Sequence, residues 1–298
     1  MAKAYHFTVE QPGTRLDKYV CQKCPDFSRT QVQKLIRDGY ITVNGKPTKA
    51  GLKLNPDDRI DIAIPPTPPS PLTPEALPLN IIYEDDDLLV IDKPAGLAVH
   101  PAPGHYSHTL VNAILSYLPS LPDSEDSLRP GIVHRLDKDT SGVMVIAKNS
   151  KAHANLGSQF KTRSVEKAYI VLVKGHLTPE SGLIEAPIGR DPCNRKRMAV
   201  VSRGRQARTQ YQVIKYIGKY TLLEVRPETG RTHQIRVHMS AIGYPVAGDA
   251  TYDEKSPHIP RQFIHAYRLG FRLPSTGEYK EFTSELPADL KQALENVA

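Results

Sequence analysis

Tryptophan is absent from the 298-residue sequence, cysteine occurs three times, and no run approaches the ~18 apolar residues that a membrane-spanning helix needs. Three cysteines are too few, and odd in number, for a disulfide framework in a chain of this length. The first ten residues, MAKAYHFTVE, hold neither an apolar stretch of signal-peptide length nor an arginine-rich amphipathic pattern. We therefore expect a cytoplasmic protein without a membrane segment.

The short motifs of several enzyme classes are missing as well. The sequence contains no G-x-x-x-x-G-K-[ST], no G-x-G-x-x-G after a strand-like run, no H-E-x-x-H and no G-x-S-x-G. Nucleotide hydrolysis, dinucleotide redox chemistry, zincin proteolysis and nucleophile-elbow hydrolysis thus lose their usual signatures. Cys21 and Cys24 form a C-x-x-C with no second pair at zinc-site spacing, so we favour small buried apolar side chains over a metal or redox role.

Basic residues are in excess and clustered. The formal net charge is +7 and the pI is near 9.2, a balance typical of a protein with a polyanionic partner. Residues 14–53 hold nine basic and three acidic side chains, and residues 193–208 hold six basic side chains and no acid. Two solvated surfaces are the alternative, but like charges gathered in this way repel one another unless a polyanion meets them.

Proline marks the clearest boundary, since residues 65–78 contain seven prolines in fourteen positions. Neither a helix nor a central strand can form there, so we expect a semi-rigid linker. It divides a small basic unit, residues 14–64, from a larger body, residues 79–298.

The small unit shows two short helices followed by a hairpin. Ser28-Arg-Thr-Gln31 is a capping box ahead of an apolar stripe, and Gly39 is placed to end that helix. Asn44-Gly45 is the strongest short hairpin signal. Arg15-Leu-Asp-Lys, Ser28-Arg29, Gly39 and Val43-Asn44-Gly45 resemble the S4-type RNA-binding module. This resemblance implies an RNA-binding edge formed by Arg15, Arg29, Lys34, Arg37 and Lys46.

The body mixes helical and strand patterns without regular strand–helix–strand spacing. Strand-like runs cover residues 88–91, 142–147, 169–173, 221–225 and 263–266, and helical patterns cover 150–163, 232–242 and 287–297. We expect Thr232 to cap the second helix, with Ile235, Met239 and Ile242 on its buried stripe. The expected fold is α+β, a mixed and largely antiparallel sheet with flanking helices.

Two polar segments carry the candidate chemistry. Residues 131–142 place Asp137 beside cations in a loop between apolar segments, and residues 230–238 place Arg236 in the first turn of a helix. A buried arginine needs an anion, and Asp137 is the obvious candidate if the fold brings the two together. Most loop aspartates are turn residues or caps, so this segment alone does not decide between a structural and a catalytic role.

These segments resemble the RluA-type family of RNA pseudouridine synthases, in its S4-bearing branch that includes large-subunit ribosomal RNA enzymes. His134-Arg-Leu-Asp137 with Thr140-Ser141-Gly142 resembles the catalytic motif of the family. The other matching motifs are Lys93-Pro-Ala-Gly96 with Val99-His100-Pro101, Glu166-Lys-Ala-Tyr169, Gly230-Arg-Thr-His-Gln-Ile-Arg-Val-His238, Gly248-Asp249 with Tyr252, and Leu286-Pro287.

The resemblance implies a role for each site residue. Asp137 is the essential carboxylate and Arg236 keeps it ionised and oriented. Tyr169 stacks on the uracil, although its apolar strand alone favours a core position. Ile235 forms the pocket floor, and Arg135 fills the gap that a flipped nucleotide leaves. His134 and Arg231 support RNA or a loop. No cofactor and no catalytic metal are expected, and the expected partner of a monomeric enzyme is ribosomal RNA.

Other classes stay open at this point. An RNA-binding or ribosome-assembly factor fits the charge equally well, but it has no electrostatic reason to keep Asp137, Tyr169 and Arg236 together. A hydrolase that uses Asp137 with Asp139, and a triad of His134, Asp137 and Ser141, are weaker. A metal site formed by His100, His105 and His108 is also weak, because no carboxylate or cysteine is beside them.

Overall fold

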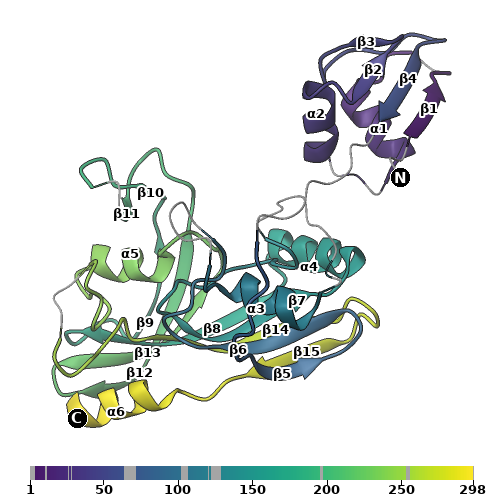
Figure 1. Ribbon diagram of the computed structural model, residues 1–298. Helices are drawn as coiled ribbons and strands as arrows, with labels where there is room; N and C mark the ends of the chain where they lie inside the picture. The colour runs from purple at the N-terminus through teal and green to yellow at the C-terminus, as the bar shows by residue number, and fades with distance from the viewer. Residues whose placement is uncertain are drawn as a thin grey trace. The chain divides into compact units, whose positions relative to one another are not determined.

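The computed structural model describes residues 4–10, 12–25, 27, 29–63, 72–101, 107–119, 121, 129–194, 197–252 and 256–297. The chain divides into two compact units, Met1–Ser70 and Pro71–Ala298 (Figure 1). Each has its own hydrophobic core, and they are considered one at a time.

The first unit packs two helices on a four-stranded sheet. Helices α1 (Leu16–Lys23) and α2 (Arg29–Arg37) precede β2 (Ile41–Val43) and β3 (Lys46–Pro47). The sheet order is β1-β4-β2-β3, with β1 (Ala4–Thr8) and β4 (Arg59–Ala63) pairing antiparallel. Asn44 and Gly45 both adopt positive φ, which confirms the hairpin turn. Ser28, the expected cap, lies outside the described residues.

The second unit is built on one nine-stranded sheet, ordered β5-β6-β7-β14-β8-β13-β12-β9, with β15 paired to β14. Among the described strands of this sheet only β7 and β14 run parallel. The expected α+β fold with a largely antiparallel sheet is confirmed. The strands are β5 (Asn80–Glu84), β6 (Leu88–Lys93), β7 (Ser141–Ala147), β8 (Glu166–Lys174), β9 (Ser181–Glu185), β12 (Arg208–Ile217), β13 (Tyr220–Pro227), β14 (Ile264–Arg272) and β15 (Tyr279–Thr283).

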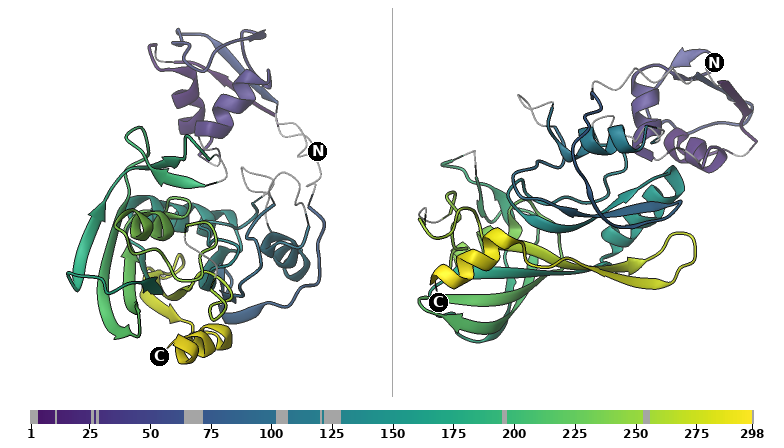
Figure 2. Two further views of the ribbon diagram at one scale, coloured as in Figure 1. Left: turned by 90° about the vertical axis from the view of Figure 1, so that its left-hand side faces the viewer. Right: turned by 60° about the horizontal axis from the view of Figure 1, so that its bottom comes forward.

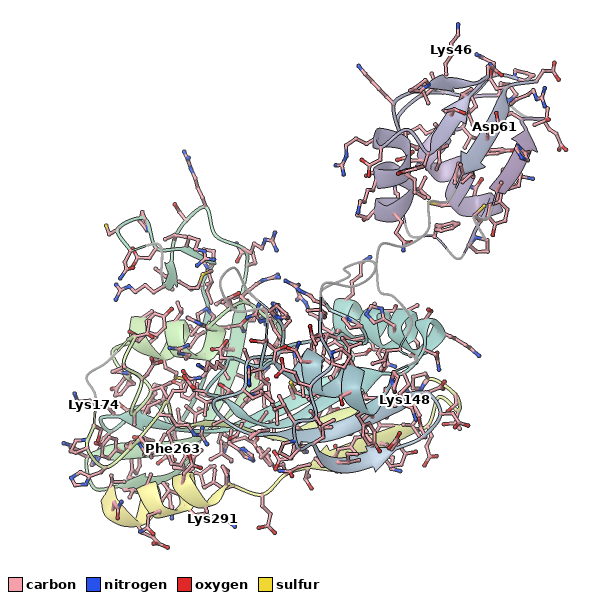
Figure 3. The ribbon with its side chains drawn as sticks, viewed as in Figure 1. Lys46, Asp61, Lys148, Lys174, Phe263 and Lys291 are labelled. Carbon is pink, nitrogen blue, oxygen red and sulfur yellow. The ribbon has the colours of Figure 1, made fainter. Side chains whose placement is uncertain are left out.

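Helices cover both faces of this sheet. Helix α4 (Ser150–Thr162) packs on Val143 and Val145 of β7, whereas α3 (Leu110–Tyr117) packs on the alternate residues Met144 and Ile146. At the other end, α5 (Gln234–Ala241) and α6 (Ala288–Val297) also lie on opposite faces (Figure 2). Phe263, labelled in Figure 3, is fully buried in the cluster beneath α6. A separate hairpin joins β10 (Ile188–Arg190) to β11 (Met198–Val200).

Two expectations about α5 are wrong. The cap residue is His233, in the left-handed conformation with φ 55°, and not Thr232. The helix therefore starts two residues later than expected, after a turn in which the Gln234 side chain bonds the Arg231 amide at 3.0 Å. Ile242 is 37% exposed because the helix ends before it, while Ile235 and Met239 are buried as expected.

The proline-rich segment is described only in part. Its described residues hydrogen-bond to α3, where the Asn112 side chain donates to the Thr73 carbonyl at 2.8 Å. Residues 64–71 lie outside the described part. No described helix is long and apolar enough to cross a membrane.

Candidate active site

One cavity of about 520 Å³ in the second unit gathers the residues that the sequence singled out there. Its lining comes from the loop before β7, the end of α4, the start of β8, and the turn that leads into α5. All seven predicted residues of this unit line it: His134, Arg135, Asp137, Tyr169, Arg231, Ile235 and Arg236.

The loop that carries Asp137 is fixed by two cations. Lys93, at the end of β6, is fully buried and its Nζ donates to three backbone carbonyl oxygens, that of Lys138 among them at 3.0 Å. Burial lowers the pKa of Lys93 to about 7. Arg261 donates to the Asp139 carbonyl at 2.9 Å. Because the consecutive carbonyls of Lys138 and Asp139 are held, Asp137 has a defined position.

Close packing behind the loop requires a glycine. Gly142 has φ 120°, and a Cβ there would lie 2.2 Å from the carbonyl oxygen of Ala266. This contact lets β7 run beside β14, so that β7 leads directly out of the Asp137 loop.

Arg236 is the centre of an ion-pair network. Its Nη1 lies 3.2 Å from Asp137 Oδ2, so the expected pair is present. The tighter partner is Asp249, which accepts from Nε at 2.6 Å and Nη2 at 2.7 Å. Burial opposes the charge of Arg236, but Asp249 and Asp137 together raise its pKa above the ordinary value. Thr251 also accepts from Nη2, at 3.0 Å. Arg236 therefore presents its Nη1 to Asp137 in a fixed direction.

Part of the cavity wall is apolar and aromatic. Tyr169 on β8 packs against the clusters beneath α3 and α5, and Ile235 is buried on α5. Burial and the charge of Asp137 raise the pKa of Tyr169, so its hydroxyl is neutral at physiological pH. A flat neutral ring beside a carboxylate suits a planar base.

His134 and Arg135 occupy different settings. His134 accepts a hydrogen bond from the Val145 amide at 3.1 Å and stacks on Phe160 with a centroid separation of 4.6 Å. Burial lowers the pKa of His134 to about 3, so the ring is neutral and braces the loop. Arg135 is exposed at the cavity wall and approaches His100 at 3.4 Å. Arg231 donates to the Gln206 carbonyl at 3.1 Å.

Sequence reasoning gave no role to several residues that the structure brings to the site. His233 lies 3.9 Å from Asp137 and pairs with the Tyr252 hydroxyl at 3.1 Å. Asp249, Lys93 and Lys167 lie in motifs that the resemblance quoted, yet only the three-dimensional contacts show what each one touches.

The competing site hypotheses find no support in the described residues. Ser141 pairs with His265 at 3.0 Å, and His134 bonds Val145, so no triad with Asp137 forms. Asp139 is exposed, with its carbonyl held by Arg261. In the described ranges no cluster of three His, Cys, Asp or Glu residues could hold a metal. His105 lies outside those ranges. Cys24 is buried and Cys21 half-buried, and neither forms a disulfide.

In the first unit, a buried carboxylate organises part of the basic edge. Asp17 is fully buried and accepts from Arg15 at 3.0 Å, from Arg29 at 2.9 Å and from Gln33 at 2.9 Å. Burial alone would raise the pKa of Asp17, but these three donors hold it far below its usual range. Arg15 and Arg29 are thus structural partners as well as surface cations.

The remaining predicted cations of this unit are exposed. Lys34 and Arg37 lie on the outer face of α2, and Lys46 projects from the β2–β3 hairpin (Figure 3). In the second unit, the described part of the basic stretch 193–208 includes β11, and Arg197 pairs with Asp191 at 2.6 Å.

A cavity with a fixed carboxylate–arginine pair and an aromatic ring, bordered by cations, suits an enzyme that acts on a nucleic-acid base. The family described as RNA pseudouridylate synthase matches residues 87–241, and the S4 domain matches residues 14–60. The chain belongs to the RNA pseudouridine synthase family. It is an isomerase that forms pseudouridine from uridine in RNA, with an S4 RNA-binding domain.

Similar proteins span most of the chain. An RNA pseudouridine synthase of Aquifex aeolicus, described as uncharacterized, is 46% identical over 98% of this chain and 96% of its own length. The ribosomal large subunit pseudouridine synthase D of Nitrosomonas europaea is 41% identical over 96% of this chain and 85% of its own. The solved structure of human RNA pseudouridylate synthase domain containing 1 has a TM-score of 0.59 and 29% identity, covering 72% of this chain and 85% of that one.

Proposed function

We propose that this enzyme converts specific uridines of large-subunit ribosomal RNA to pseudouridine, with Asp137 as the essential carboxylate in a base-flipping pocket. The single observation that carries the proposal is the placement of Asp137, 3.2 Å from Arg236, in a cavity that Tyr169 also lines. The relative named ribosomal large subunit pseudouridine synthase D supports the choice of RNA. A cytoplasmic, monomeric enzyme with domains at 14–64 and 79–298, joined by residues 65–78, is part of the same proposal.

The chemistry needs an ionised carboxylate and a base that cannot escape. The bond from uracil nitrogen 1 to the ribose breaks, the base turns, carbon 5 bonds to the same ribose carbon, and a proton leaves carbon 5 while nitrogen 1 gains one. Asp137 can add to the ribose or to the uracil, or remove a proton to start elimination. In each route Arg236 holds the carboxylate charged and directed, and a bound uridine displaces water from the cavity around it.

The other pocket residues bind the base and the RNA around it. Tyr169 stacks on the detached uracil, a contact that stabilises a bound base by about 1–3 kcal/mol. Ile235 forms the floor, and Arg135 enters the space that the flipped nucleotide vacates. Arg231 supports the RNA at the entrance, and His134 braces the loop. The cations of the first unit, Arg15, Arg29, Lys34, Arg37 and Lys46, contact RNA phosphates.

The test is pseudouridine mapping in ribosomal and transfer RNA from cells that lack the protein, complemented with wild type or Asp137→Asn. Defined large-subunit uridines should lose the modification, and only wild type should restore it. Purified Asp137→Asn on the same RNA should be slower by roughly 10⁴-fold, as for loss of a covalent or proton-transfer carboxylate. Full restoration by Asp137→Asn would remove Asp137 from the chemistry, and sites only in transfer RNA would change the substrate.

A further inference from the structure

The cavity continues past the Asp137–Tyr169 region along β8 toward the end of α4. Side chains alternate along a strand, so Lys167 and Tyr169 point to the same face of β8, about 7 Å apart. Both line the cavity, and Phe160, Lys161 and Arg163 complete this part of its wall. This second part carries no role in the mechanism above.

Lys167 is a half-buried cation in an apolar setting. Two residues before it, Val165 is buried in the α4 cluster, and two residues after it, Tyr169 lies on the same face of β8. Among the described residues, no carboxylate forms an ion pair with Lys167 and no acceptor forms a hydrogen bond with it. A half-buried ammonium group without a partner is costly, so such a position is typical of a ligand site.

The groups around Lys167 add positive charge. Burial, with a smaller contribution from the charge of Arg163, lowers the pKa of Lys167 to about 8, and Arg163 ends α4 in the left-handed conformation. The neighbouring ring of His134 is neutral. The two acids that line the cavity are used elsewhere: Asp137 pairs with Arg236, and Glu228 lies 3.2 Å from Arg208.

We propose that Lys167, with Arg163 beside it, binds a phosphodiester group of the substrate RNA directly next to the target uridine. If the ribose of the target uridine lies at Asp137 and its base lies on Tyr169, the phosphate that links it to the next nucleotide lies about one nucleotide length from the carboxylate. Lys167 lies two residues from Tyr169 on the same strand, β8. An RNA phosphate supplies the anion that this part of the cavity lacks, and a charge-assisted bond forms on binding. The inference rests on the proposed function and adds to it a subsite for the backbone of the flipped nucleotide.

The test compares Lys167→Met with Lys151→Met, a matched charge removal on the exposed N-terminal turn of α4, outside the cavity. The substrate is an RNA oligonucleotide around a mapped target uridine, with or without a neutral methylphosphonate at either linkage next to it. We expect Lys167→Met to raise KM by about 10-fold with kcat unchanged, since a charged hydrogen bond to bound RNA is lost in ground and transition states alike. Lys151→Met should leave KM unchanged.

The methylphosphonate identifies the phosphate. A methylphosphonate at one of the two linkages should raise the KM of the wild type about 10-fold. The same substitution should not change the KM of Lys167→Met further, because that variant has already lost the contact. Full additivity at both linkages, or a Lys167→Met variant that behaves like Lys151→Met, would overturn the subsite.

Two controls separate other failures. Removing an unpartnered cation should leave Tm unchanged or raise it, and Lys167→Arg should restore KM, so a general folding defect is recognised by a lower Tm and no rescue. If wild type forms no pseudouridine in the oligonucleotide, the proposed function fails. The subsite is then tested by measuring the dissociation constant of the same variants for the same oligonucleotides, with and without the methylphosphonate.

Discussion

Arg236 is buried between two carboxylates that differ in how tightly they hold it. Asp249 takes two short hydrogen bonds and is 1% exposed, whereas Asp137 takes one longer bond and is 19% exposed. The arrangement separates two tasks: Asp249 fixes the guanidinium, and Arg236 in turn directs Asp137 toward the open cavity. Asp249 is therefore a positioning residue.

Asp249→Asn should uncouple these tasks. Breaking a buried pair leaves Arg236 poorly compensated, so the free energy of unfolding should fall by about 3 kcal/mol in urea titrations. The rate constant kcat should fall roughly 10²-fold, because a small misplacement of a catalytic group has such an effect. Glu285→Gln is the control, since Glu285 pairs with Lys291 but is 90% exposed. Equal behaviour of the two variants would contradict the positioning role.

His134 gives the fold a pH dependence. Its folded-state pKa of about 3 lies below the unfolded value near 6.5, so the unfolded state binds the proton first as pH falls. The stabilisation is fully present above about pH 6.5 and is lost as pH decreases toward 3, by roughly 2 kcal/mol between pH 6.5 and 5. Urea titrations of wild type and His134→Gln at both pH values measure the difference in slope. Because other histidines titrate in both proteins, parallel slopes would show that His134 is not the source.

At the scale of elements, the close packing of β7 on β14 depends on a glycine, Gly142, at the start of β7. Gly142→Ala should lower the free energy of unfolding by at least about 2 kcal/mol, because φ is unfavourable for alanine and the Cβ meets the Ala266 carbonyl at 2.2 Å. Gly157→Ala in α4 has open space around its Cβ and should stabilise by about 0.5–1 kcal/mol. Thermal unfolding of both variants measures the contrast, and an unchanged or higher Tm in Gly142→Ala would show that the junction tolerates a Cβ.

Elements with a strong local signal could be predicted from the sequence, and those that depend on tertiary pairing could not. The apolar runs in β6, β7, β8 and β13 are buried on both faces, and the helical pattern of α4 lies within one residue of its bounds. Strand β12 alternates polar and apolar residues with a register shift near Val213, which dilutes its pattern. Strand β1 is short and only pairing with β4 reveals it.

The same distinction applies to the site. Asp137 and Arg236 could be paired because a buried arginine needs an anion. Asp249 could not be predicted as the tighter partner of Arg236. Nothing in the sequence around Asp249 indicates which of the two carboxylates lies closer to the guanidinium. The αL conformation of His233 was missed for a related reason: Thr232 is the better cap by residue type, but Gln234 already satisfies the turn.

At the scale of the whole molecule, the candidate active site and the S4 domain belong to different units. The second unit holds the cavity, and the first holds cations of two kinds: Arg15 and Arg29 neutralise the buried Asp17, while Lys34, Arg37 and Lys46 have exposed side chains. Removing Arg15 or Arg29 changes both folding and binding. Only substitutions of the exposed cations measure RNA contact separately from folding.

Arg37→Ala should therefore weaken RNA binding without unfolding the first unit. If Arg37 contacts one phosphate, the slope of log K against log salt should become less steep by about 0.7 to 0.9, with kcat on saturating RNA unchanged. Arg29→Ala should reduce the slope too, but it also lowers the stability of the first unit, because Asp17 keeps its burial and loses a donor. Lys291→Ala on α6 is the charge control. Filter binding at several salt concentrations and thermal unfolding distinguish these cases, and an unchanged slope in Arg37→Ala would remove α2 from the RNA interface.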